Sequence, residues 1–103
     1  MVDVVRTSLN HCPGTTPGPA TEAAEALDNL WAHTVPEDGL EHASARTGRG
    51  RLDLLLLLLP PEGPVAPDTT DRAAALVARS HRNSPVLTLR YLPPAPAPSA
   101  SGH

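Results

Sequence analysis

The chain has 103 residues and a net charge of −3. Its length is enough for one domain and too short for two. All eight basic residues are arginine, phenylalanine is absent and aromatic residues make up 2% of the chain. The negative net charge argues against nucleic acid as a partner, and the aliphatic composition disfavours sites built on aromatic stacking. The single cysteine, Cys12, excludes an intramolecular disulfide. No signal-peptide pattern opens the chain, and its longest leucine run is far shorter than the roughly 20 residues of a membrane span. We therefore expect a cytoplasmic protein without a membrane partner.

The first part of the chain predicts a strand, a loop and a helix. Residues 2–9 are rich in β-branched side chains, whereas residues 10–20 hold prolines and glycines typical of a loop. Thr21 can cap a helix that ends before Pro36 and Gly39. The apolar stripe expected on this helix consists of Ala23, Leu27, Leu30 and Trp31.

The leucine-rich segment in the middle of the chain predicts one arm of a β-hairpin. Residues 40–47 alternate weakly, and residues 47–50 hold two glycines that suit a tight turn. Residues 51–59 form the second arm. Leucine favours helices, but eight or nine residues between Gly50 and Pro60 is a normal strand length and a short helix. No capping residue precedes the run, so the strand is the better prediction.

The last part of the chain predicts a second helix, a final strand and a tail. Asp68 is placed to cap the helix, and Asn83 is placed to end it. Its expected buried stripe consists of Ala73, Leu76, Val77 and Ser80. Residues 86–92 alternate as a strand does, and residues 93–103 are rich in Pro, Ala and Ser and are expected to be disordered.

The predicted order of elements is β-α-β-β-α-β. This order resembles the ferredoxin-like fold, an α+β sandwich in which two helices cover one face of a four-stranded antiparallel sheet ordered 4-1-3-2. The resemblance implies one domain over residues 1–92 followed by the tail over residues 93–103. It implies nothing about function, because this fold hosts many unrelated activities.

A central strand that is apolar on both sides predicts a protein interface. Successive side chains alternate between the two faces of a strand, and the helices of this fold cover only one face. Either set of alternate leucines could lie on the uncovered face, with Val86 and Leu92 as the alternative extension. We predict a homodimer or a protein partner on a face made of Leu54, Leu56, Leu58, Leu87, Leu89 and Tyr91.

Basic residues are expected to gather at one end of the sheet, where the first loop, the hairpin turn and the end of the second helix meet. They could bind an anion together with the amide groups of the first helix. The alternative is that the charges near the second helix only complement its dipole and that the hairpin arginines are solvated. The candidate anion-binding residues are Arg46, Arg49, Arg51, Arg82 and His81. Arg79 belongs to the same predicted basic end, and Asp38 to an acidic end opposite.

No motif in the sequence predicts a catalytic, metal or cofactor site. His11 and Cys12 stand in the loop after the first strand, but one cysteine and one adjacent histidine cannot close a tetrahedral metal site. The chain has no lysine for a phosphate-binding loop. We expect no cofactor and a non-enzymatic interaction or regulatory module that self-associates or joins a larger assembly. The alternatives are an anion- or metabolite-binding domain and a small dimeric α+β-barrel enzyme using His11, His33 or His42.

Overall fold

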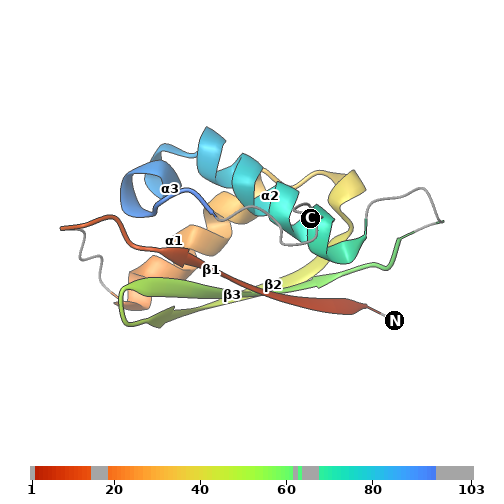
Figure 1. The fold of residues 1–103 in the computed structure, drawn as a ribbon, viewed down its shortest axis with the longest axis horizontal. Coiled ribbons are helices and arrows are strands. Elements are labelled where there is room, and N and C mark those ends of the chain that lie inside the picture. The colour runs from red at the N-terminus through yellow and green to blue at the C-terminus, as the bar shows by residue number, and fades with distance from the viewer. Residues whose placement is uncertain (1, 15–18, 62, 64–67, 95–103) are drawn as a thin grey trace, which may run out of the picture.

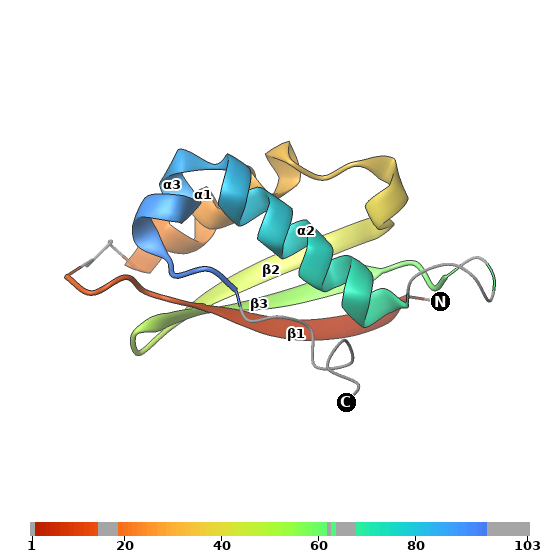
Figure 2. The ribbon, with the colours of Figure 1, turned by 45° about the horizontal axis from the view of Figure 1, so that its top comes forward.

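The protein is an α+β fold in which helices cover one face of a three-stranded antiparallel sheet (Figure 1). The computed structural model describes residues 2–14, 19–61, 63 and 68–94. The strands are β1 (Asp3–Asn10), β2 (Leu40–Gly48) and β3 (Arg51–Leu58), in the spatial order β1-β3-β2. The helices are α1 (Pro19–Ala32), α2 (Thr69–Asn83) and α3 (Pro85–Arg90), and a 3₁₀ turn, η1, covers Pro36–Asp38. The helices lie together on one side of the sheet (Figure 2).

The leucine run is a strand at the centre of the sheet, as predicted. Leu56 stands opposite Val5 on one side and Ala43 on the other. The β2–β3 turn uses Gly50 with a φ of 71°, a left-handed conformation that glycine adopts at little cost. Tertiary pairing on both edges thus overrides the helical preference of leucine.

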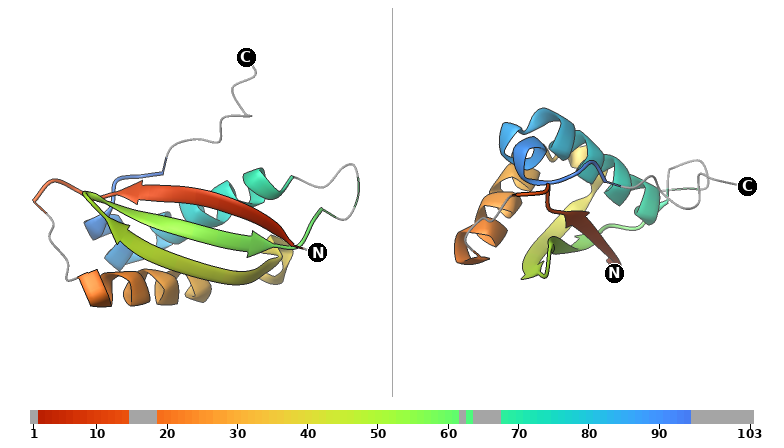
Figure 3. Two further views of the ribbon diagram at one scale, coloured as in Figure 1. Left: turned by 90° about the horizontal axis from the view of Figure 1, so that it is seen from below. Right: turned by 60° about the vertical axis from the view of Figure 1, so that its left-hand side comes forward.

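The two faces of β3 have different environments, which the leucine run alone did not distinguish. Its even-numbered side chains are buried under the helices together with Leu9, Leu30, Leu76, Val77 and other core residues. The odd-numbered ones lie on the opposite face, which no described helix covers (Figure 3). Asp53, Leu55 and Leu57 occupy that face of β3. We refer to it as the open face.

The second helix follows the sequence prediction closely, and the first departs from it. Asp68 caps α2 by accepting a 2.8 Å hydrogen bond from the backbone N–H of Asp71. The predicted stripe of Ala73, Leu76, Val77 and Ser80 is buried. Helix α1 begins at Pro19 rather than after Thr21, and its most buried positions are Glu22, Ala26 and Leu30. Trp31, predicted to lie in the stripe, is exposed.

The predicted fourth strand is wrong, because residues 85–90 form the helix α3. Ser84 caps this helix, with its hydroxyl accepting from the backbone N–H of Leu87 at 3.2 Å, and Pro85 occupies the first turn, where its missing N–H costs nothing. In a helix, Leu87 and Leu89 point to different sides. Leu87 is buried, whereas Leu89 is 76% exposed. The fold is therefore not a complete ferredoxin-like βαββαβ sandwich with four strands.

Directly after α3, the chain forms a short β-type pairing at the position predicted for the fourth strand. His11 and Tyr91 form an isolated antiparallel bridge. On either side of it, the N–H of Leu92 donates to the carbonyl of Asn10 and the N–H of Cys12 donates to the carbonyl of Arg90, each at 2.8 Å. Within the described residues, the C-terminal segment thus pairs with the end of β1 and the two residues that follow it.

The predicted tail from residue 93 lies mostly outside the described residues, since the description ends at residue 94. In the described part of the chain, none of the helices combines the length and apolar character needed to cross a membrane.

Candidate functional site: the open face of the sheet

The open face is organised into three rows of side chains that run across the strands. In the first row, Asp53 lies between Ser8 and Arg46; in the second, Leu55 lies between Arg6 and Ser44. The third row places Leu57 between Val4 and His42. The face is therefore polar toward the hairpin turn and apolar toward the other end of the sheet.

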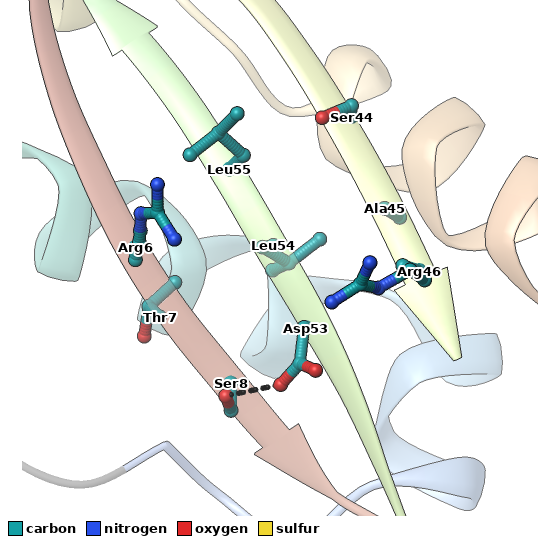
Figure 4. A pocket seen from close by; sticks show the side chains of 9 residues that line it. All are labelled: Arg6, Thr7, Ser8, Ser44, Ala45, Arg46, Asp53, Leu54 and Leu55. Atoms are coloured by element: carbon teal, nitrogen blue, oxygen red, sulfur yellow. Dashed lines mark hydrogen bonds between the residues drawn. The ribbon is translucent and has the colours of Figure 1, made fainter. Parts of the chain in front are cut away.

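A shallow hollow of about 590 Å³ occupies the polar part of this face (Figure 4). Leu55 and Asp53 belong to its floor on β3, with arginine side chains from both outer strands beside them. The hollow is open to solvent along the sheet. Its lining consists of Arg6, Thr7, Ser8, Ser44, Ala45, Arg46, Asp53, Leu54 and Leu55.

Asp53 is held in its charged form by its neighbours. The hydroxyl of Ser8 donates to Asp53 Oδ1 at 2.8 Å, and Arg51 Nε donates to the same atom at 3.0 Å. The Ser8 hydrogen bond, followed by Arg51 and Arg46, keeps the pKa of Asp53 below its usual value. Its charge is thus already balanced within the chain.

The two arginines of the hollow have different surroundings. Arg46 reaches from β2 toward β3 and interacts electrostatically with Asp53 (Figure 4). Arg6 stands on the other outer strand, and no described residue accepts a hydrogen bond from its guanidinium or forms an ion pair with it. Counting Arg6, Arg46 and Arg51 against Asp53, this end of the open face carries excess positive charge on a chain whose net charge is negative. A partner that covers this end of the face and excludes water from it must supply a hydrogen-bond acceptor for the Arg6 guanidinium.

The structure places the predicted interface side chains in the core or the helical layer, although Leu54 also contributes to the lining of the hollow. Five of them, Leu54, Leu56, Leu58, Leu87 and Tyr91, are buried in the core of the chain itself. Leu89, the sixth, is exposed on α3 in the helical layer. The uncovered apolar side chains are instead Val4, Leu55 and Leu57. The sequence contained a signal for this, since Asp53 marks the odd-numbered positions of β3 as the polar side.

The structure brings only two of the predicted anion-binding residues together, since Arg46 and Arg51 both interact with Asp53. Arg46 lines the hollow, Arg51 pairs with Asp53, and Arg49 is exposed at the hairpin turn. The other two lie on α2, in the helical layer: Arg82 is exposed, whereas His81 is buried with its Nε2 atom 2.8 Å from the carbonyl oxygen of Tyr91. The sheet separates these two groups.

The predicted separation of the molecule into a basic end and an acidic end is also incorrect for Arg79 and Asp38. Arg79, assigned to the basic end, forms a 2.5 Å ion pair with Asp38, assigned to the acidic end. The Arg79 guanidinium also donates to the carbonyl of His33 at 3.0 Å. This contact fastens α2 to the segment between α1 and β2, so these charges stabilise the fold instead of forming a surface field.

No sequence pattern predicts the buried polar cluster that lies between the end of β1, α1 and the C-terminal segment. Glu22 is 1% exposed, and its Oε2 atom accepts from the Tyr91 hydroxyl at 2.6 Å. His11 Nε2 lies 2.6 Å from the same oxygen. Burial, together with the Glu22 carboxylate, raises the pKa of Tyr91 well above its usual value. His11 is therefore engaged in holding the fold together.

The described residues offer no cluster of three or more His, Cys, Asp or Glu side chains that could hold a metal ion. His11, His33 and His42 lie at the end of β1, after α1 and on β2 respectively. Cys12 is a partly buried free thiol. Comparisons with protein-family models, with curated proteins and with solved structures gave no match.

Proposed function

We propose that this protein is a small interaction module that self-associates through the open face of its sheet. The observation that carries the proposal is the apolar part of that face. Leu55 and Leu57 lie side by side on the central strand with no described element above them, and Val4 beside them is 55% exposed. Covering these side chains with a partner removes apolar surface from water.

A second copy of the chain can cover this face without placing its arginines against each other. A two-fold axis parallel to β3 keeps the three rows aligned and exchanges the outer strands. Arg46 of one copy then faces Ser8 of the other, beside Asp53, and Arg6 faces Ser44. Leu55 and Leu57 meet their own counterparts at the centre, and so does Asp53. Each Asp53 carboxylate is compensated within its own chain by Arg51 and Arg46. No arginine is placed opposite an arginine, so the Asp53 pair is the like-charge contact that the apolar side chains must outweigh.

Replacing Leu57 with glutamate is expected to convert a dimer into a monomer, because the two introduced carboxylates would be buried opposite each other between the sheets. The measurement is molar mass by light scattering over a broad range of protein concentration. Leu89→Glu is the matched control, since Leu89 is an exposed leucine in the helical layer. It should leave the mass of the dimer unchanged. A wild-type protein that is monomeric throughout, or a dimer broken by Leu89→Glu and not by Leu57→Glu, would exclude this interface.

A second candidate function is the binding of a small anion in the hollow, favoured by Arg6, which has no counter-ion among the described residues, and by Arg46 across from it. Two guanidinium groups with nearby serine hydroxyls suit a carboxylate or phosphate. In a thermal-shift assay over a panel of carboxylated and phosphorylated metabolites, a compound that binds should raise the melting temperature of the wild type. The Arg6→Ala/Arg46→Ala variant should lose the shift, whereas Arg82→Ala should keep it. A shift that survives the double substitution places the anion elsewhere.

A further inference from the structure

The outer edge of β1 is a second feature of the sheet, separate from the open face, along which the described residues supply no further strand. β1 is an edge strand in the order β1-β3-β2. The N–H of His11 points toward the hairpin, donating to the carbonyl of Gly50, whereas the carbonyl of Asn10 and the N–H of Cys12 face the C-terminal segment. Backbone groups alternate along a strand, so the N–H and C=O groups of Val4, Arg6 and Ser8 point away from the sheet.

The C-terminal segment forms main-chain hydrogen bonds with the last part of this edge, but its sequence cannot extend them along β1. Leu92 donates its N–H to Asn10, which sets an antiparallel register in which even-numbered residues face even-numbered residues. Beyond Leu92, the even-numbered residues of the sequence are Pro94, Pro96 and Pro98. Proline has no N–H, so the chain's own tail cannot donate to Ser8, Arg6 and Val4 in the same register.

We infer that the outer edge of β1 accepts an extended, acidic peptide segment of a partner protein as a fourth strand. Strand addition would satisfy the outward backbone groups through a ladder of main-chain hydrogen bonds. Side chains of the added strand that face the open side would lie next to Val4, Arg6 and Ser8. Arg6 lacks a counter-ion among the described residues, and it would find one in a carboxylate directly opposite.

A second copy of β1 is a poorer occupant of this edge. Antiparallel pairing of residues 4–8 with themselves over their full length places Arg6 opposite Arg6 of the partner. Like charges directly opposite one another destabilise a strand pair. An arginine on an edge strand thus works against self-pairing and favours a partner of opposite charge.

The experiment uses amide hydrogen exchange of the full chain with a short, capped peptide in which threonine alternates with glutamate. In the free protein, the amides of Val4, Arg6 and Ser8 should exchange fast, while those of Val5 and Thr7, which face β3, should be protected. Saturating peptide should slow the three outward amides by about tenfold or more. A peptide with lysine in place of glutamate should bind more weakly, and one N-methylated at each glutamate should not bind.

Two variants separate backbone pairing from charge. Arg6→Pro removes one outward N–H and should abolish binding, whereas Arg6→Ala keeps the N–H and should remove only the preference for glutamate over lysine. If Arg6→Pro disturbs the strand, the N-methylated peptide gives the same test on the wild type. Binding that is insensitive to N-methylation would overturn the proposal, as would the absence of any slowing at the three amides.

The proposal extends beyond the proposed function and fails independently of it. Leu57→Glu, which is expected to break the face-to-face dimer, should still bind the acidic peptide. Protection of Val4, Arg6 and Ser8 that grows with protein concentration in the absence of peptide would show a second copy on the edge, and it would overturn the peptide as occupant.

Discussion

Replacing Glu22 with alanine is expected to lower the free energy of unfolding by about 3 kcal/mol. The substitution removes the acceptor of the buried Tyr91 hydroxyl and the partner of His11, and it leaves both groups with an unsatisfied donor. The cluster joins the end of β1, the first turn of α1 and the C-terminal segment, so its loss is felt in three elements. Urea unfolding followed by circular dichroism measures the effect.

Glu25→Ala is the matched control for Glu22→Ala. Glu25 lies one turn further along α1 and forms an exposed ion pair with Arg90 at 2.5 Å. Exposed pairs contribute little, so this variant should cost less than about 1 kcal/mol. Equal effects of the two substitutions would contradict the role assigned to the buried cluster.

Leu56→Ala is expected to lower the free energy of unfolding by roughly 2–5 kcal/mol, the cost of a cavity in a close-packed core. Leu56 is fully buried at the centre of β3, between β1 and β2 and beneath the helices. Leu57→Ala, one residue further along the same strand, removes the same atoms from the open face and should cost about 1 kcal/mol or less.

The comparison between Leu56→Ala and Leu57→Ala is made by denaturant unfolding at low protein concentration. At that concentration, self-association does not add to the effect of Leu57→Ala. If Leu57→Ala is as damaging as Leu56→Ala, the open face is already covered in the monomer and is not available to a partner.

The hairpin and the second helix could be predicted from the sequence because their signals are local. Gly50 supplies the turn, Pro60 limits the length of the leucine run, and Asp68 starts α2 with a standard cap. Each of these features acts within a few residues of the chain. They determine where an element begins and ends without reference to the rest of the fold.

The last segment was mispredicted because two local signals competed. The alternation of Leu87, Leu89 and Tyr91 is typical of a strand, whereas Ser84 followed by Pro85 is typical of a helix start. The capping signal prevailed, since the Ser84 hydroxyl both caps α3 and donates to Asn29 Oδ1 on α1 at 2.7 Å. That second contact joins residues far apart in the sequence, so no local sequence pattern predicts it.

The buried carboxylate and the open face could not be derived from periodicity of apolar residues. Glu22 looks like a favourable charge in the first turn of a helix, and only its contact with Tyr91, 69 residues away, shows that it is buried. On the central strand, six consecutive leucines conceal which side faces the helices. Asp53 resolves the ambiguity, because its charge favours the open face and fixes the positions of Leu55 and Leu57.

The central claim is that a partner copy covers Leu55 and Leu57, and methyl NMR of the leucines during dilution tests it most directly. The methyl groups of Leu55 and Leu57 should gain access to a soluble paramagnetic probe as the protein is diluted and the dimer dissociates. Those of Leu54 and Leu56 should stay shielded at every concentration, because the chain's own helices cover them. Methyl groups of Leu55 and Leu57 that are equally accessible at all concentrations would contradict the claim.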